Sequence, residues 1–169
     1  MKTIAQQLNV KDFPFVINDK DCNEIYYEES DGYWYKKDYD AHGNIIRFEN
    51  SNGFWTKREY DAQSNEIRYE DSNGTWSKRE FDAQSNEIYL EDSDGYWTKR
   101  EHDAQGNIIR GENSTGHWYK REYDDNGKQI YYEDSTGYIK DNRPKGVELT
   151  LQQIADKFGI NVEQLRIKD

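Results

Sequence analysis

Apolar and polar positions recur along this chain with a strict period of 21 residues. In each period a glycine is followed two positions later by a tryptophan, then by an aromatic–aspartate step, and later by an isoleucine. The tryptophans are Trp34, Trp55, Trp76, Trp97 and Trp118, and Ile139 closes the series. A period held through six copies without insertion indicates a repeat architecture.

Two turn signals divide each copy into two strands. The first is an Asp-Gly or Asn-Gly dipeptide, such as Asn52-Gly53, which favours a two-residue type I′ hairpin loop. The second is a five-residue segment such as Asp61–Asn65, which fits a type I turn followed by a bulge. Each copy is therefore predicted to form one β-hairpin.

The lengths of these two turns predict a register. A two-residue loop pairs Ser51 with Phe54, and the bulged turn pairs Asp61 with Asn65. Together the two turns place equivalent residues of successive copies in line, without slip and without reversal of the faces.

This register assigns the side chains to two solvated faces. One face carries the tryptophans, together with lysines that lie between aromatic rings, as Lys57 does between Phe48 and Tyr69. The opposite face carries an arginine row bordered by glutamates such as Glu66 and Glu87. The row consists of Arg47, Arg58, Arg68, Arg79, Arg100 and Arg110. Neither face is a dry core.

The predicted fold class is all-β. We expect an elongated antiparallel meander of about a dozen strands, built from the 21-residue hairpin repeats, as a single-layer or coiled sheet with short helical caps at both ends. The expected organisation has three parts. They are an N-terminal cap with a short helix and the first strand (1–23), six hairpin repeats (24–141) and a C-terminal helical cap (142–169).

The cap helices are predicted from local signals. Thr150–Gly159 opens with a capping box between Thr150 and Gln153 and ends at a glycine. Ile4–Val10 is an abbreviated echo of Ile154–Ile160. We expect the caps to cover the sheet edges, and a homodimer through these ends is the alternative. A DNA-binding helix-turn-helix is disfavoured because the last 29 residues carry equal numbers of acidic and basic residues.

Composition and charge limit the classes of function. The net charge is −11, and the whole acidic excess lies between Glu24 and Lys140. This charge argues against nucleic acid or an anionic membrane as a direct ligand. The aromatic content of 15% favours a folded chain over a disordered one. The lone Cys22 permits no internal disulfide, and no apolar run opens the chain, so a cytoplasmic location is expected.

No constellation of residues predicts catalysis. The three histidines, His42, His102 and His117, each stand at a repeat position, and Cys22 has no histidine near it in the sequence. Asp19–Asn23 begins like a calcium loop but lacks the glycine and the final glutamate that such a loop requires. We therefore expect no enzyme, no metal site and no cofactor.

The aromatic–aspartate turn resembles a known repeat. Tyr39-Asp40-Ala41-His42-Gly43-Asn44, followed by Gly53, is similar to the YD repeat of large bacterial shell-forming toxins, and Gly-aromatic-Trp resembles variant MORN repeats. The resemblance spans roughly Asp19 to Asp141 and concerns architecture. It implies β-hairpin repeats of the kind that enclose toxin domains, and some relatives are linked to carbohydrate contact. This chain has too few repeats to close a shell.

The expected function is that of a non-enzymatic binding protein. The leading hypothesis is an acidic inhibitor of the phage anti-defence type, which mimics nucleic acid and binds a basic nucleic-acid-binding protein. A carbohydrate- or surface-binding repeat module and a structural scaffold are the alternatives, and the acidity also serves solubility. The candidate partner-binding residues are Asp40, Asp61, Asp82, Asp103, Asp124, Trp55, Trp76 and Trp97.

Overall fold

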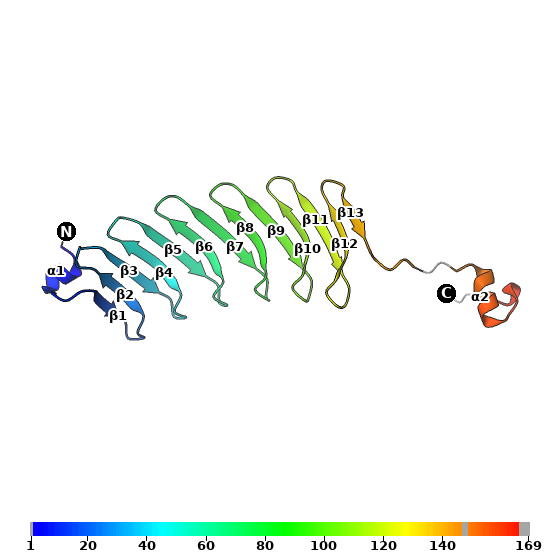
Figure 1. Cartoon of the computed structure of the whole chain (residues 1–169), viewed down its shortest axis with the longest axis horizontal. Helices are drawn as coiled ribbons and strands as arrows, with labels where there is room; N and C mark the ends of the chain where they lie inside the picture. Colours follow the sequence, from blue (N-terminus) through cyan, green and yellow to red (C-terminus); the bar gives the residue numbers. More distant parts are fainter. Residues whose placement is uncertain (1, 147–148, 166–169) are drawn as a thin grey trace.

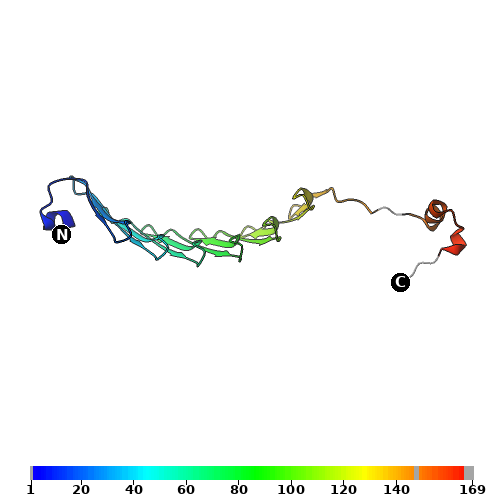
Figure 2. The same cartoon turned by 90° about the horizontal axis from the view of Figure 1, so that it is seen from below.

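The computed structural model describes residues 2–146 and 149–165. It confirms the predicted fold class. Thirteen strands follow one another in chain order as a single antiparallel meander, each hydrogen-bonded to the next, and the sheet is not closed. Figure 1 shows the strands side by side in one layer, and Figure 2 shows that this layer is curved along its length.

The elements follow the predicted repeats. The short helices are α1 (Ile4–Leu8), α2 (Leu151–Phe158) and a 3-10 turn, η1 (Val162–Gln164). The strands are β1 (Phe15–Asn18), β2 (Glu24–Glu28), β3 (Trp34–Tyr39), β4 (Ile45–Asn50), β5 (Trp55–Tyr60), β6 (Glu66–Asp71), β7 (Trp76–Phe81), β8 (Glu87–Asp92), β9 (Trp97–His102), β10 (Ile108–Asn113), β11 (Trp118–Tyr123), β12 (Gln129–Asp134) and β13 (Ile139–Asp141).

The turn at each Asn-Gly or Asp-Gly dipeptide is one residue longer than predicted. Between β4 and β5, the Asn50 N–H donates to the Phe54 carbonyl at 2.9 Å, and the Gly53 N–H donates to the Asn50 carbonyl at 3.0 Å. Gly53 has a φ of 83°, whereas Asn52 is not among the described residues with positive φ. A type I′ loop needs positive φ at both positions, so the predicted two-residue loop is wrong. A type I turn with a glycine bulge fits instead.

The second turn is the bulged turn that the sequence predicts. The Asp61 N–H donates to the Asn65 carbonyl at 3.0 Å, and Ser64 has a φ of 65°. One carboxylate oxygen of Asp61 accepts the backbone N–H groups of Gln63 and Asn65, each at 2.9 Å. Its other oxygen accepts the Asn65 side-chain amide at 2.9 Å. The aspartate of the repeat therefore closes its own turn.

The tyrosine that precedes this aspartate connects neighbouring strands. Tyr60 Oη donates to the Ile45 carbonyl at 3.2 Å, from β5 to the start of β4. The same hydrogen bond joins Tyr39 Oη to the Glu24 carbonyl one copy earlier, and Tyr123 Oη to the Ile108 carbonyl three copies later. The hydrogen bond of Tyr60 links β4 and β5 beyond the end of their ladder, which the pair Arg47 and Lys57 closes.

The longer turn displaces each copy relative to the one before it. Lys57 pairs with Glu70 on β6, and Glu70 pairs with Trp76 on β7. Trp76 therefore lies in line with Lys57, where the predicted register placed Lys78. The prediction of copies without slip is wrong, because each copy advances by two residues, or roughly 7 Å. An even shift keeps the faces constant, and the stagger accounts for the inclined strands in Figure 1.

The register also changes which side chains share a face. Glu49 pairs with Trp55 and Phe48 pairs with Thr56, so Phe48 lies on the side opposite Trp55 and Lys57. The predicted single arginine row is wrong, since it splits between two faces. The tryptophan face carries all five tryptophans with Arg47, Arg68 and Arg110. The arginine–aromatic face carries Arg58, Arg79, Arg100 and Arg121 with Phe48, Tyr69, Leu90 and Tyr132.

Ion pairs run along the arginine–aromatic face as a continuous chain. Glu66 accepts from Arg58 at 3.2 Å and from Arg79 at 2.6 Å. Glu87 lies 3.7 Å from Arg79 and also pairs with Arg100. These ion pairs confirm, for this face, the prediction that Glu66 and Glu87 lie beside arginines. All five side chains are half-buried. The sheet depends on such cross-strand pairs because few side chains are fully buried.

The two predicted helices are present at the ends. Thr150 forms the expected capping box with Gln153, and Gly159 ends α2 in the left-handed conformation. Figures 1 and 2 both show α2 apart from β13, so in this arrangement α2 does not cover that edge as a cap would. Residues 147–148 and 166–169 of the predicted C-terminal cap lie outside the described residues.

Replacing Cys22 by glycine is expected to stabilise the first hairpin. It occupies the left-handed position of the first bulged turn, with a φ of 66°, where other copies have glycine, as at Gly43. Its side chain is exposed and unbonded to another cysteine. A side chain in this conformation costs about 1 kcal/mol, so Cys22→Gly should stabilise the first hairpin by that amount. Hydrogen exchange of the Asp19 amide, which bonds to the Asn23 carbonyl, measures the gain.

Ser64→Gly is the matched control. Ser64 has the same backbone conformation, but its hydroxyl accepts a hydrogen bond from the Asn44 side chain in the neighbouring turn at 3.1 Å. Glycine at this position relieves strain and loses that bond, so we expect a smaller gain than at Cys22. An equal or larger gain at Ser64 would contradict this account of the turns.

Candidate functional site on the tryptophan face

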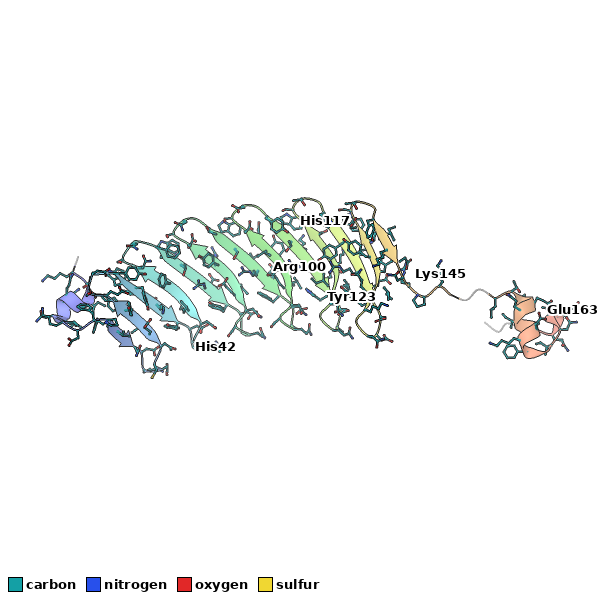
Figure 3. All side chains as sticks on the ribbon, in the orientation of Figure 1. His42, Arg100, His117, Tyr123, Lys145 and Glu163 are labelled. Atoms are coloured by element: carbon teal, nitrogen blue, oxygen red, sulfur yellow. The ribbon has the colours of Figure 1, made fainter. Side chains whose placement is uncertain are left out.

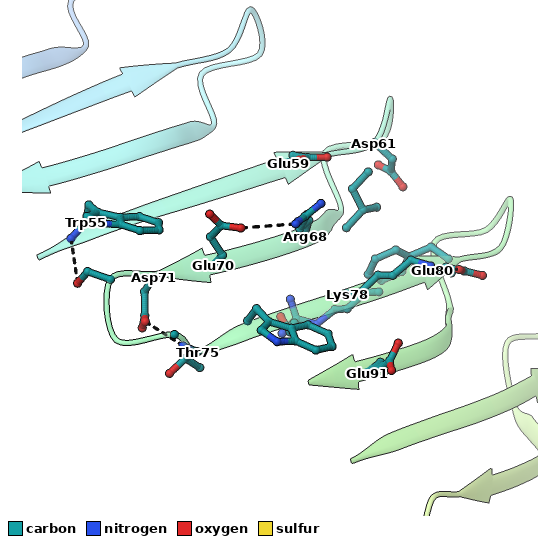
Figure 4. A pocket seen from close by; sticks show the side chains of 17 residues that line it. Trp55, Glu59, Asp61, Arg68, Glu70, Asp71, Thr75, Lys78, Glu80 and Glu91 are labelled. Carbon is teal, nitrogen blue, oxygen red and sulfur yellow. Dashed lines mark hydrogen bonds and ion pairs between the residues drawn. The ribbon is translucent and has the colours of Figure 1, made fainter. Parts of the chain in front are cut away.

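A trough of about 1060 Å³ lies on the tryptophan face, lined mainly by residues of β5, β6 and β7. Trp55 and Trp76 belong to its lining, and Ile67 and Arg68 lie on the strand between them. Figure 4 shows the labelled side chains of this trough and the hydrogen bond from Arg68 to Glu70 on its floor. A concave, partly apolar surface with polar groups around it is the usual form of a ligand site.

The tryptophans are held by the turns of the following copy. The Trp55 carbonyl accepts the Ser72 N–H at 3.0 Å, and the Trp55 N–H faces the Ser72 hydroxyl at 3.4 Å. The Trp76 carbonyl accepts the Ser93 N–H at 2.9 Å in the same way. Each of these tryptophans is the first residue of its strand, and these hydrogen bonds fix its backbone. The repeat thus sets both the spacing and the face of these rings.

Lysines cover most of these rings. Four tryptophans have the lysine two residues further along the same strand placed over the indole. The nitrogen-to-centroid distances are 4.9 Å for Lys36 and Trp34, 4.8 Å for Lys57 and Trp55, 5.1 Å for Lys99 and Trp97, and 5.6 Å for Lys120 and Trp118. Each contact is worth about 0.5–1 kcal/mol at an exposed site. Cation–π contacts were predicted, but with rings of neighbouring strands as partners.

Trp76 is the tryptophan whose ring has no lysine over it. Lys78 turns instead toward Tyr89, 5.9 Å from that ring, and pairs with Glu80 at 3.1 Å. Tyr89 stands where three copies have arginine, as at Arg68, and where the first and last copies have tyrosine, and it lies directly across from Glu80. Trp76 is 39% exposed. The different course of Lys78 therefore leaves one indole uncovered, and this indole lies in the trough.

The charges around the trough are predominantly negative. Its lining contains six carboxylates and three cationic side chains. Glu70 pairs with Lys57 at 3.2 Å and with Arg68 at 3.5 Å. Glu91 accepts a hydrogen bond from Tyr89 Oη at 3.1 Å. Burial and this hydrogen bond raise the pKa of Tyr89, so its hydroxyl remains a donor at neutral pH.

The predicted aspartate row lies in the bulged turns at one side of the sheet. In each of these turns the aspartate carboxylate accepts backbone N–H groups of its own turn. The aspartates are Asp40, Asp61, Asp82, Asp103 and Asp124. The hydrogen bond from the Asn65 side chain holds the pKa of Asp61 below its ordinary value, and the equivalent asparagines do so for Asp40, Asp82 and Asp103. The repetition of this aspartate thus has a structural cause, and binding by it stays a prediction.

The structure brings together three of the eight predicted site residues, namely Trp55, Trp76 and Asp61. Trp97 lies outside the lining of the trough. The sequence did not indicate that Glu70, Lys78 or Tyr89 matters at this site. Tyr89 gave no distinguishing signal, because tyrosine also holds this repeat position at Tyr26 and Tyr131.

Other kinds of site find little support within the described part of the chain. No group of three or more histidine, cysteine, aspartate or glutamate side chains is placed to hold a metal ion among these residues. Asp19 accepts hydrogen bonds from the backbone and side chain of Asn23, so Asp19–Asn23 is the first bulged turn of the repeat. No described helix has the length and apolar character needed to cross a membrane.

No protein-family model matches the sequence, and no curated protein sequence matches it either. Similarity appears among solved structures, in the crystal structures of TcdB2-TccC3-Cdc42 and of TcdB2-TccC3. Their TM-scores are 0.53 and 0.52, each at 15% sequence identity. Each match covers 70% of this chain but 7% of the toxin chain, so the likeness concerns the fold of a short segment. These toxin chains contain YD-repeat shell architecture. The chain is thus a β-hairpin repeat protein whose sheet resembles a piece of such a shell.

Proposed function

We propose that this chain is a carbohydrate-binding repeat module, with the trough between Trp55 and Trp76 as its binding site. The observation that carries the proposal is the uncovered indole of Trp76 in a trough that Trp55, Ile67 and Phe81 also line, with charged side chains around them. A sugar ring has an apolar face and hydroxyl groups at its edge. An exposed aromatic ring beside charged hydrogen-bonding groups matches both parts.

The polar groups around Trp76 are of the types that bind hydroxyls. Carboxylates such as Glu70 accept hydrogen bonds, and Arg68 donates through a planar fork. Because carboxylates outnumber cations in the trough, an anionic chain is repelled, whereas a neutral or amino-sugar chain is not. The proposed ligand is therefore a neutral or amino-sugar oligosaccharide that extends across the strands.

Nucleic-acid mimicry has weaker support from the geometry. Its motivation was the row of repeat aspartates, and these carboxylates are hydrogen-bonded inside their own turns. Replacing them by asparagine would also perturb the turns, so such variants do not isolate a binding role. The net charge of −11 keeps this hypothesis testable through the salt dependence of partner binding.

Trp76→Ala is expected to weaken oligosaccharide binding at least tenfold, because it removes the stacking ring. A tenfold change corresponds to about 1.4 kcal/mol. Titration calorimetry with neutral β-linked glucose and N-acetylglucosamine hexamers, a glucosamine hexamer and an anionic uronate oligomer measures the effect. Tryptophan fluorescence gives an independent reading of the same titration.

Trp97→Ala is the matched control, because Trp97 holds the same repeat position outside the trough and its ring is covered by Lys99. We expect its affinity to remain within twofold of the unchanged protein. Equal losses in both variants, or no binding of any oligosaccharide, would exclude the proposed site. Salt-sensitive capture of a basic nucleic-acid-binding protein without sugar binding would favour mimicry instead.

A further inference from the structure

The N-terminal helix is anchored on the tryptophan face by one buried carboxylate. Glu28 on β2 is 1% exposed, and it accepts hydrogen bonds from the Thr3 hydroxyl, the Ala5 N–H at 3.1 Å and Tyr26 Oη at 2.6 Å. Tyr26 is 3% exposed and its ring lies 6.3 Å from that of Trp34. The start of α1 therefore docks on β2, which is the second strand from this edge of the sheet.

The C-terminal helix α2 is built like α1. Both helices open with a Thr-x-x-Gln capping box and stop at a left-handed residue that precedes an apolar one, and in both a fully buried alanine lies four residues before that left-handed residue. α2 is three residues longer. Counted from the N-caps, Thr3 and Gln6 correspond to Thr150 and Gln153, and counted from the C-caps, Ala5, Asn9 and Val10 correspond to Ala155, Gly159 and Ile160. The sequence echo between the two ends thus corresponds to equivalent N-terminal and C-terminal caps on helices of different length.

The sheet surface at the C-terminal end repeats the surface that α1 covers. Five periods after Tyr26 and Glu28 come Tyr131 and Glu133, on β12, which is also the last strand but one. Tyr131 Oη donates to Glu133 at 3.0 Å, as Tyr26 Oη does to Glu28. Ile139 pairs with Glu133 at the position of Trp34 and is 57% exposed. The Tyr–Glu pair therefore recurs beside an exposed apolar side chain, and Lys120 takes the place across from Glu133 that Phe15 holds across from Glu28.

The chain leaves the sheet on the side that this docking requires. Arg143 follows β13, and its guanidinium lies 4.1 Å from the centre of the Tyr131 ring and 3.2 Å from Glu122. Both partners belong to the tryptophan face. Six residues lie between Arg143 and Thr150 along the chain, which allows a reach of roughly 20 Å. This length is sufficient for the start of α2 to meet Glu133.

Apolar groups on α2 match the exposed surface. Leu151 in its first turn and Phe158 in its last are 48% and 70% exposed. Isolated large apolar side chains are common at protein surfaces, but here they belong to the same short segment and have a defined counterpart in Ile139. The helix and the sheet end each leave apolar surface uncovered.

We propose that α2 of this chain docks on the end surface formed by Tyr131, Glu133 and Ile139, in the manner in which α1 docks on β2. The Thr150 hydroxyl and a first-turn N–H of α2 donate to the Glu133 carboxylate, and Leu151 packs on Ile139. The arrangement in Figure 3, with Lys145 between the sheet and the helix that precedes Glu163, is then the undocked state. Docking covers the end of the tryptophan face.

Hydrogen exchange of the α2 amides in the full chain tests this docking. Glu133→Gln should increase their exchange at least tenfold, because the charged acceptor is lost. Glu112→Gln, at the same position one copy earlier, should leave them unchanged. Ile139→Gln provides a second route to the same result, since Ile139 is exposed in the undocked state and can be replaced without disturbing the sheet. Unprotected α2 amides in the unchanged protein, or equal exchange in all variants, would overturn the proposal.

The identity of the docked copy is tested by dilution. Protection that is constant over a hundredfold range of protein concentration supports docking within one chain, because a tethered segment experiences a fixed effective concentration. Protection that disappears on dilution would assign α2 to a second copy of the chain and would overturn the intramolecular proposal.

Discussion

Gly111→Ala is expected to destabilise the fifth copy by about 2 kcal/mol, the typical effect of overpacking. A Cβ at Gly111 would lie 2.5 Å from Cζ of Tyr119, which faces Gly111 across β10 and β11. Tyr119 cannot move aside freely, because Arg121 lies 4.4 Å from its ring centre and Tyr132 stacks beside it at 6.4 Å. Denaturant unfolding followed by circular dichroism measures the loss.

A compensating exchange tests the cause of this loss. Two copies earlier along the chain, the same pair of positions holds Tyr69 and Ser77, so one position is large and the other small in each case. Gly111→Tyr alone should be at least as harmful as Gly111→Ala. The double variant Gly111→Tyr with Tyr119→Ser should recover most of the stability, since it recreates the pair of the earlier copy. A double variant no more stable than Gly111→Tyr would show that steric conflict with Tyr119 is not the cause.

Glu28→Gln is expected to release α1 from the sheet, with a local loss of about 2–3 kcal/mol. The buried carboxylate accepts three hydrogen bonds, and hydrogen bonds to charged groups contribute more than neutral ones. Faster exchange of the Ala5 amide would report the release. Glu49→Gln is the matched control, because Glu49 holds the same position one copy later and is partly exposed, so its loss should stay within about 0.5 kcal/mol.

The contribution of Glu28 should also depend on pH in a defined direction. Burial by itself raises the pKa of Glu28, but the hydrogen bonds from Thr3, Tyr26 and Ala5 outweigh it and leave the pKa below the ordinary value of 4.5. The unfolded chain therefore binds this proton more readily than the folded one. The stabilisation is fully present above pH 4.5 and is lost as the pH falls through the lower folded value.

Thermal unfolding of the unchanged protein and of Glu28→Gln checks this direction. The difference in stability between the two should be constant near neutral pH and should shrink on acidification below pH 4.5. A difference that grows in acid would mean that the carboxylate is held in its protonated form.

The structural features that the sequence predicted correctly depend on local signals. The bulged turn at Asp61–Asn65 was predictable because an aspartate at its start and a left-handed residue at its fourth position act within five residues. The helix after Thr150 was predictable because its capping box and glycine stop are also local. Neither depends on what the neighbouring copies do.

The prediction of the strand register was wrong for a specific reason. Asn52-Gly53 is compatible with a two-residue loop, but Asn50 accepts the N–H groups of Asn52 and Phe54 and so stabilises the longer turn. One additional residue in a turn exchanges the partners of every residue in the strand. The consequence was that Phe48 and Lys57 were assigned to one face, although they lie on opposite faces.

The sequence by itself determined the repeat, the antiparallel meander of about a dozen strands in chain order and the two helices, because each of these depends on spacing along the chain. The tertiary structure alone decided which side chains share a face, that Trp76 is left uncovered beside Tyr89, and that Gly111 makes room for Tyr119. These outcomes depend on pairs from different strands. Such pairs are fixed by the backbone conformation of a turn, and its hydrogen bonds are decided by competition among several acceptors rather than by the period.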